Sequence, residues 1–238
     1  MSVGNPRAPR PLALGAGPAE AEPDGPGSLW LVDAAQEGSA ALGLAAGYLD
    51  AHERRRAAAF RREEDRRCYV TAHVALRVLL GARTGTGAGG VRFEREPCAS
   101  CGGPHGQFVA PDAGLHFSLS HSGDLTLLAF GPAALGVDVE ALPSRAAVRE
   151  LGGQLHPREH AELLALAEEE RPAAFARTWV RKEAYLKGLG LGLSRDVSLD
   201  YVGTGPGGAS ALPGWSVADV AVPSGFAGAV AVPDAEGR

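Results

Sequence analysis

The stretch LHFSLSHSGDLTLLAFGPAALGVDVEAL, Leu115–Leu142, decides the fold that this sequence predicts. Short runs rich in apolar residues are separated by two groups of turn-forming residues, HSGD and GPAA. Runs of this length between turn formers are typical of β-strands joined by tight connections. We therefore expect three strands here, at residues 115–119, 125–130 and 135–140.

Helical patterns lie on both sides of this block. Apolar side chains recur at helical spacing, and glycine or proline stands near the segment ends. The expected helices span residues 50–62, 64–82, 157–168 and 172–187. Further strand candidates are LWLVDAA, which begins at Leu29, then VRFER, VSLDYV, WSVADVAV and GFAGAVAV. Helices combined with a small, mostly antiparallel sheet in each half predict an α+β protein, built from two similar subdomains.

The expected boundaries follow from these elements. We place the N-terminal subdomain at residues 28–134 and the C-terminal subdomain at residues 135–232. Residues 1–27 are rich in Pro, Gly and Ala, which predicts a disordered tail. This tail lacks the long apolar region of a secretory signal. No repeat in the sequence is strong enough to prove that the halves arose by duplication.

Composition narrows the class of protein. The 238 residues carry a net charge of -5, which argues against a nucleic-acid binder. No apolar run reaches the roughly 18 residues of a membrane span. Three cysteines are a poor basis for a disulfide framework. We therefore expect a cytoplasmic, monomeric protein that binds neither nucleic acid nor membranes.

Two acidic residues share one face of the third expected strand. Side chains alternate along a strand, so Asp138 and Glu140 in GVDVE point the same way, about 7 Å apart. Two carboxylates held this close repel each other unless a cation lies between them. Oxygen ligands suit a hard ion such as Mg²⁺. The alternative is an ordinary solvated outer face.

The chain has two lysines, and both lie in WVRKEAYLKGLGLGL, Trp179–Leu193. Glu183 and Lys187 are one helical turn apart on one face, and Trp179 lies on the same stripe. An exposed Glu–Lys pair would explain the spacing but not the use of lysine in a chain that otherwise uses arginine. Lysine is compact and can transfer a proton, whereas arginine cannot. A site for phosphate or proton transfer would therefore retain lysine.

A third polar group lies in FSLSHSG. Ser118, Ser120 and His121 stand at the end of a strand and its turn. A histidine beside hydroxyls is compatible with a nucleophilic pair, with a phosphate contact, or with a purely structural role. The G-x-S-x-G pattern of a nucleophile elbow is absent from the sequence.

Taken in order, FSLSHSG, GVDVE and WVRKEAYLKGLGLGL resemble the motifs of the surfactin-type 4′-phosphopantetheinyl transferases. The resemblance runs from about Leu29 to Val232, which is most of the chain. It implies two similar α+β halves packed as a pseudo-dimer, with the active site between them. It also implies Mg²⁺-dependent transfer of the phosphopantetheine arm of coenzyme A to a serine of an acyl or peptidyl carrier protein, with release of 3′,5′-ADP.

The resemblance carries a role for each motif residue. Asp138, Glu140 and Glu183 would hold Mg²⁺ against the pyrophosphate of coenzyme A. Glu183 would also serve as the base toward the carrier serine. Lys187 would protonate or stabilise the leaving phosphate, and His121 would contact the phosphates. The residues implied to contact coenzyme A are Arg56, Gln107, Ser118, Ser120, His121, Asp138 and Lys187. For Lys182 the motif match supplies no function, and its role is expected to be structural.

Four positions depart from the family pattern. Gln107 stands where a lysine is often found, and Ser118 replaces the more usual asparagine. Glu53 occupies a position upstream of Arg56 where a basic residue can occur. Cys68 falls where a third arginine often follows. These departures bear on the affinity for coenzyme A rather than on the metal ligands or on the leaving phosphate.

Other interpretations remain open from the sequence. One is a serine acyltransferase or esterase that uses Ser120 and His121. Another is a non-catalytic relative that binds coenzyme A, for which Gln107 and Glu53 are the support. Finally, CASCGGPH has a spacing that could bind zinc through Cys98, Cys101 and His105, but a structural zinc site needs four ligands and no second pair follows.

Overall fold

The computed structural model describes residues 7–15, 28–97, 102–103, 107–191, 195–207 and 212–234. Its strands are β1 (Arg10–Pro11), β2 (Ser28–Asp33), β3 (Glu94–Arg95), β4 (Phe108–Val109), β5 (His116–Ser122), β6 (Leu125–Gly131), β7 (Gly136–Ala141), β8 (Trp215–Val220) and β9 (Phe226–Pro233). Its α-helices are α1 (Ala34–Tyr48), α2 (Ala51–Ala58), α3 (Glu63–Thr84), α4 (Arg145–Leu151), α5 (Pro157–Ala165) and α6 (Arg171–Gly188). The protein is α+β, as the sequence predicts.

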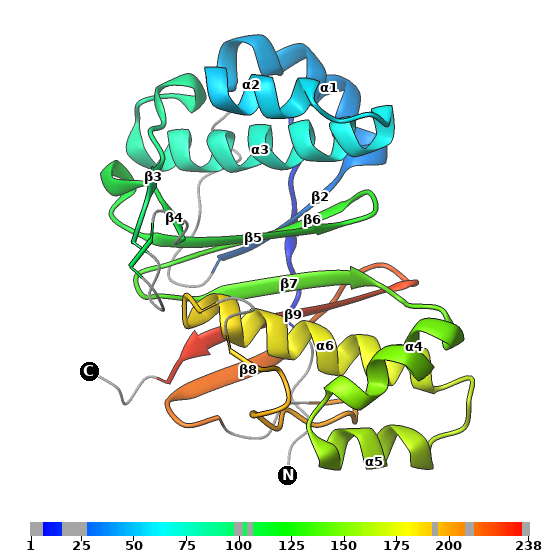
Figure 1. The fold of residues 1–238 in the computed structure, drawn as a ribbon. Coiled ribbons are helices and arrows are strands. Elements are labelled where there is room, and N and C mark those ends of the chain that lie inside the picture. The colour runs from blue at the N-terminus through cyan, green and yellow to red at the C-terminus, as the bar shows by residue number, and fades with distance from the viewer. Residues whose placement is uncertain are drawn as a thin grey trace.

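The elements form four layers (Figure 1). Helices α1, α2 and α3 cover one sheet, whose strand order is β1-β2-β6-β5. Helix α6, flanked by α4 and α5, covers a second sheet of order β7-β9-β8. The two sheets lie between the helical layers, and pairing within them is antiparallel except between β1 and β2. A separate pair, β3-β4, lies at one side.

Alternation along the strands explains why both faces of each sheet are buried. In the first sheet one face packs against α1 and α3 through Trp30, Val32, Leu128 and Phe130, among others. The opposite face meets the second sheet through Leu29, Leu125, Leu127, Val137, Val139 and Val230. The far face of the second sheet packs under α6 through Val217, Ala229 and Ala231. Val137 and Val139, which alternate with the two acidic residues along β7, are both fully buried.

The two halves repeat one connectivity. Apart from the two-residue strands β1, β3 and β4, the first half runs strand, helices, then two strands, as β2, α1–α3, β5 and β6, and the second runs as β7, α4–α6, β8 and β9. In each sheet the third strand of the set lies between the first and the second, giving β2-β6-β5 and β7-β9-β8. Pseudo-dimeric packing and the boundaries 28–134 and 135–232 stay predictions.

Local chemistry sets several helix ends. Asp50 and Glu53 form a reciprocal capping box at the start of α2, and His156 and Glu159 do the same for α5. Helix α3 opens with three acidic residues, which favour the positive end of the helix dipole, and ends at Gly85, whose φ of 68° suits glycine. These signals place α2, α3, α5 and α6 within a few residues of the predicted helices.

Three expectations are wrong in part. Residues 7–15 are ordered within the expected disordered tail, because Leu12 and Leu14 are buried in the first core and β1 pairs with β2. Helix α1 was not expected, since its Ala- and Gly-rich sequence shows little apolar contrast between its faces. VSLDYV, residues 197–202, forms turns rather than a strand, because its backbone is bonded by α5 and α6 side chains.

The N-terminal segment crosses both halves. The Arg7 amide donates to Asp219 O at 2.9 Å in β8 of the second half. Further along, the Leu12 amide donates to Leu31 O at 3.0 Å in β2 of the first half. A single short segment therefore joins the outer edges of the two sheets. Among the described residues, no helix has both the length and the apolar character needed to cross a membrane.

Candidate active site

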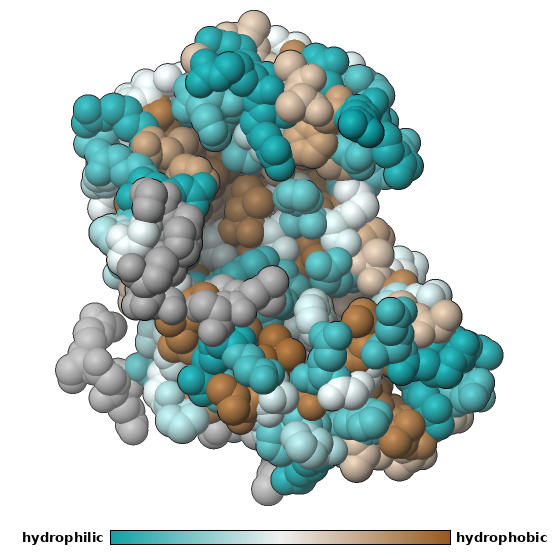
Figure 2. Space-filling view, in the orientation of Figure 1, coloured by the Kyte–Doolittle hydropathy of each residue, from teal (hydrophilic) through white to brown (hydrophobic). Residues whose placement is uncertain are grey.

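A pocket of about 430 Å³ opens where β5, β7 and α6 meet. It is lined by Leu119, Ser120 and His121 from β5, Asp138 and Glu140 from β7, and Trp179, Glu183 and Lys187 from α6. The surface is hollowed between the two halves, where hydrophobic and hydrophilic side chains meet (Figure 2). The three sequence motifs, far apart along the chain, therefore meet at one place.

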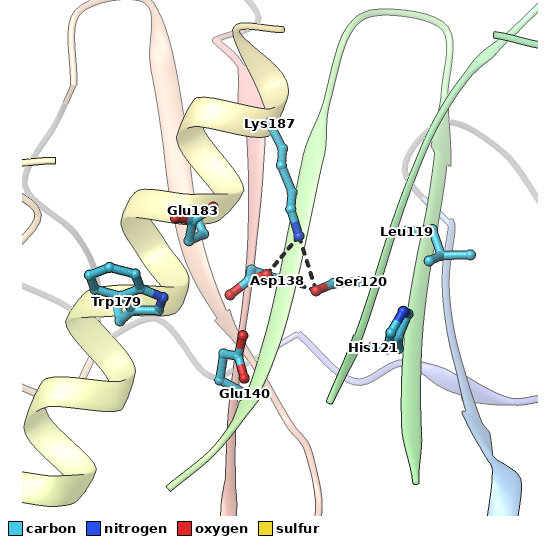
Figure 3. Close-up of a pocket in the computed structure, with 8 residues that line it drawn as sticks. All are labelled: Leu119, Ser120, His121, Asp138, Glu140, Trp179, Glu183 and Lys187. Carbon is cyan, nitrogen blue, oxygen red and sulfur yellow. Dashed lines mark hydrogen bonds and ion pairs between the residues drawn. The ribbon is translucent and has the colours of Figure 1, made fainter. Parts of the chain in front are cut away.

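The close approach of α6 to β7 depends on a glycine. A Cβ atom at Gly136, the first residue of β7, would lie 1.9 Å from the Ala184 carbonyl oxygen in α6. No side chain fits in that space, so only glycine lets the helix rest directly on the strand. Because Trp179, Glu183 and Lys187 are spaced by four residues, they then form a stripe beside the acidic face of β7 (Figure 3).

Lys187 links the two halves at the centre of the pocket. Its Nζ lies 2.7 Å from Asp138 Oδ1 and donates to Ser120 Oγ at 3.0 Å (Figure 3). Ser120 Oγ in turn donates to Asp138 Oδ1 at 2.7 Å. The other oxygen of this carboxylate, Asp138 Oδ2, is buried and has no hydrogen-bond partner in the described part of the chain. Asp138 is 2 % exposed, so half of a nearly buried anion is unsatisfied.

The three carboxyl groups perturb one another. Burial raises the pKa of Asp138 above its ordinary value, opposed by the charge of Lys187. Burial also raises the pKa of Glu140 and of Glu183, and the nearby Asp138 charge raises both further. Among the described residues none donates a hydrogen bond to Glu183. Three anions that share one pocket with one lysine retain an excess of negative charge.

The arrangement of Ser120 and His121 contradicts a nucleophilic pair. The single proton of Ser120 Oγ is donated to Asp138, and no hydrogen bond joins Ser120 to His121 among the described residues. His121 lines the same pocket from another side. Desolvation by the surrounding protein lowers the pKa of His121, and the charges of His73 and Lys187 act in the same direction. The esterase interpretation therefore loses its catalytic dyad.

Ser118 does not reach the pocket. It is buried, and its Oγ accepts a hydrogen bond from the Val137 amide at 3.1 Å. Its hydroxyl joins β5 to the backbone of β7, and the expectation that Ser118 lies near a nucleotide stays a prediction. Ser122, two residues beyond Ser120, was missed by the sequence argument although it shares the face of Ser118 and Ser120.

Lys182 and Glu53 are structural. Lys182 is 2 % exposed and its Nζ forms an ion pair with Glu159 Oε2 at 2.8 Å. Glu53, which departs from the family pattern, is buried and accepts a hydrogen bond from Arg77 Nε at 2.7 Å. It thereby fixes α2 on α3. Its acidic character consequently gives no support to a non-catalytic relative.

Two expected contacts for coenzyme A lie outside the pocket. Arg56 is exposed on α2, with its guanidinium 5.4 Å from the centre of the Phe60 ring. Gln107 lies beside Gly190, just after the end of α6 that carries Lys187. Both assignments stay predictions.

The cysteine motif gives no metal site that can be described. Cys98, Cys101 and His105 lie outside the described residues, so the zinc hypothesis stays untested. The remaining cysteine, Cys68, is a conceivable fourth zinc ligand by residue type, but its Sγ donates to Gly123 O at 3.0 Å. Burial raises the pKa of Cys68 to about 11, which keeps the thiol protonated.

The pocket carboxylates have the chemistry of a hard-cation site. Within the described part of the chain, no three His, Cys, Asp or Glu side chains are already arranged as a metal cluster. Mg²⁺, however, commonly takes one or two carboxylates and completes its shell with water and phosphate oxygens. The unsatisfied Asp138 Oδ2, together with Glu140 and Glu183, offers oxygen ligands in the required excess of negative charge. The residues present therefore fit Mg²⁺.

Comparison with known proteins agrees with this chemistry. The family described as the 4′-phosphopantetheinyl transferase superfamily matches residues 134–212, which include β7 and α6. The 4′-phosphopantetheinyl transferase HetI of Nostoc sp. strain PCC 7120 is 33% identical over 208 residues, covering 86% of each chain. AcpT of Escherichia coli O157:H7 is 39% identical over 93 residues, 38% of this chain and 48% of that protein. The transferase ffp of Bacillus subtilis is 26% identical over 149 residues, 62% of each chain. By the extent of the HetI match, this chain belongs to the 4′-phosphopantetheinyl transferase superfamily.

Proposed function

We propose that this enzyme transfers the 4′-phosphopantetheine arm of coenzyme A to a serine hydroxyl of an acyl or peptidyl carrier protein, in a Mg²⁺-dependent reaction that releases 3′,5′-ADP. We also place it in the surfactin-type subfamily, on the three motifs FSLSHSG, GVDVE and WVRKEAYLKGLGLGL. The cytoplasmic location and the monomeric state expected from the sequence stay predictions.

One observation carries the proposal. Asp138 is held by Lys187 and Ser120 through Oδ1, while its buried Oδ2 has no hydrogen-bond partner among the described residues. A buried carboxylate oxygen without a donor is costly unless a ligand satisfies it. Glu140 and Glu183 line the same pocket, so the missing partner is a cation rather than a neutral donor. When bound, Mg²⁺ would neutralise and orient the pyrophosphate oxygens of coenzyme A.

Three side chains of the pocket would carry out the remaining steps of transfer. Glu183 has no hydrogen-bond donor among the described residues, so it is free to take the proton of the carrier serine, directly or through water. Lys187, fixed by Asp138 and Ser120, supplies a compact positive charge and a proton for the leaving phosphate. His121 lines the opposite wall, where it can donate to the phosphates.

The carrier protein requires a docking surface. Arg145 and Arg149 are exposed on α4, one turn apart, directly after the acidic strand β7. The nearby apolar side chains of Val148 and Leu155 are buried against α5 and α6, so they contribute no contact to this surface. The proposed docking surface is therefore mainly basic. The family resemblance implies carrier proteins that are acidic around the modified serine, and a basic surface suits them.

Intact mass measurement tests the proposal directly. The full chain is incubated with coenzyme A, Mg²⁺ and an apo carrier protein, and the mass of the carrier should rise by one phosphopantetheine. Excess EDTA should prevent the change, and added Mg²⁺ should restore it. Binding of coenzyme A without any change in carrier mass would favour a non-catalytic relative. Transfer that is unaffected by EDTA would remove the metal assignment.

A further inference from the structure

Three serines of β5 face the edge of β7. Among the described residues, strand β5 pairs only with β6, and β7 only with β9, so the two neighbouring strands are edge strands of separate sheets. Ser118, Ser120 and Ser122 alternate along β5 and all bond to β7. We call these three residues the serine seam. Side-chain hydroxyls thus replace a backbone ladder at the place where the two halves meet.

The serine seam provides hydrogen-bond acceptors for backbone amides at the edge of β7. An edge strand leaves amides without partners, which must be bonded to side chains, water or another strand. The Val137 amide donates to Ser118 Oγ at 3.1 Å, and the Ala141 amide donates to Ser122 Oγ at 3.1 Å. A serine hydroxyl can accept one such bond while it donates another. Two of the three serines therefore act as acceptors for the strand edge.

Ser122 alone combines this edge contact with a bond to a pocket carboxylate. Its Oγ accepts from the Ala141 amide and donates to Glu140 Oε2 at 2.8 Å. Because the amide occupies the acceptor side of the hydroxyl, the direction in which the hydroxyl donates is set by the backbone of β7. No other hydrogen bond to the Glu140 carboxylate is found in the described part of the chain.

We propose that Ser122 is a positioning residue that holds the Glu140 carboxylate in the orientation needed to bind the divalent cation. Glutamate has three rotatable side-chain bonds, and at the mouth of a pocket it would otherwise lose this orientation. Partners that orient a metal ligand from behind in this way strongly affect affinity. The inference rests on the proposed metal-dependent function.

Ser118, in the same serine seam, provides a control for the substitution of Ser122. Ser118 lies on the same strand face and accepts from the same strand edge, but it has no hydrogen bond to a carboxylate within the described part of the chain. Ser120 bonds Asp138 and Lys187 and is part of the centre itself. Ser118→Ala therefore disturbs the joint between the sheets without releasing a pocket carboxylate, whereas Ser122→Ala does both.

Binding of Mn²⁺ alone to the full chain, followed by electron paramagnetic resonance of the free ion, tests the proposal without any turnover. Ser122→Ala should weaken Mn²⁺ binding about tenfold. Ser122→Thr, which keeps the hydroxyl, and Ser118→Ala should stay within about twofold of the native protein. If Ser122→Ala fails to fold, Ser122→Cys provides a weaker donor of similar shape and should give an intermediate loss.

A double-variant cycle then asks whether the serine acts through the glutamate. If it does, adding Ser122→Ala to Glu140→Gln should weaken Mn²⁺ binding no further than Glu140→Gln alone. Additive losses, unchanged affinity in Ser122→Ala, or an equal loss in Ser118→Ala would each overturn the proposal. If the native protein binds no Mn²⁺, or if Asp138→Asn binds it normally, the metal site itself fails and the inference fails with it. Additive losses, unchanged affinity in Ser122→Ala, or an equal loss in Ser118→Ala would leave the metal site intact. Failure of the Ser122 inference can therefore be distinguished from failure of the metal site.

Discussion

Replacing Lys182 with methionine should destabilise the fold while sparing the chemistry. Its ammonium and the Glu159 carboxylate form an ion pair of 2.8 Å, with 2 % and 0 % of the two side chains exposed. Lys182 Nζ also donates to Val197 O at 2.8 Å and to Asp200 O. The pair therefore ties α5, α6 and residues 195–207 together, on the side of α6 away from the pocket.

The magnitude follows from the burial of both partners. Removal of one member of a buried ion pair leaves the other charge uncompensated, at a cost of about 3–5 kcal/mol. In a protein of this size each kcal/mol lowers the melting temperature by about 2–4 °C. Lys182→Met should therefore lower the melting temperature by about 6–20 °C. Turnover measured well below the transition should remain close to native, because the side chain does not line the pocket.

Thermal unfolding of Lys182→Met beside two further variants tests this prediction. Arg66→Met removes a cation whose 3.5 Å pair with Glu63 is solvent-exposed, and it should cost less than about 1 kcal/mol. Adding Glu159→Gln to Lys182→Met should recover part of the loss, because the buried charge is removed while the amide oxygen can still accept from the Val202 amide. A Lys182→Met protein as stable as Arg66→Met would refute the reasoning.

Three further predictions concern the pocket and its partner. Lys187→Arg should reduce turnover strongly with little change in the affinity for coenzyme A, because it loses the transferable proton; steady-state kinetics that match the native enzyme would contradict this. Glu183→Gln should abolish transfer yet raise the melting temperature of the metal-free protein. Burial raises the Glu183 pKa above 4.5, so its contribution to stability is lost as the pH rises through the folded-state value. The excess in melting temperature over the native protein, measured in EDTA, should therefore grow as the pH rises above the ordinary glutamate value of 4.5, and a constant difference would count against the assignment. Arg145→Glu combined with Arg149→Glu should raise the KM for the carrier severalfold, leave the KM for coenzyme A unchanged and flatten the salt dependence; an unchanged carrier KM would place docking elsewhere.

Local pattern was sufficient for much of the fold and part of the site. The period of two in GVDVE puts Asp138 and Glu140 on one face, and the period of 3.6 puts Glu183 and Lys187 on one stripe. Both relations depend on backbone geometry over a few residues, so they hold before any tertiary contact forms. The same reasoning could have found Ser122, which continues the alternation of Ser118 and Ser120.

Contacts between residues far apart in the sequence could not be predicted from local periodicity. The sequence places Asp138 and Lys187 in separate motifs, 49 residues apart, and the ion pair between them exists because Gly136 lets α6 rest on β7. Likewise, whether a serine of β5 meets substrate or the backbone of β7 depends on how the two sheets pack against each other.

The sequence by itself determined the α+β class, the main strands and helices, and the kind of chemistry that the motifs can perform. The tertiary structure decided which lysine is buried and which faces the pocket, that Glu53 serves the fold, and that residues 7–15 join both sheets. The physical reason is that periodicity describes one element at a time. Burial, ion pairing and the satisfaction of strand edges depend on which elements become neighbours, and that is fixed by the packing of the shared cores.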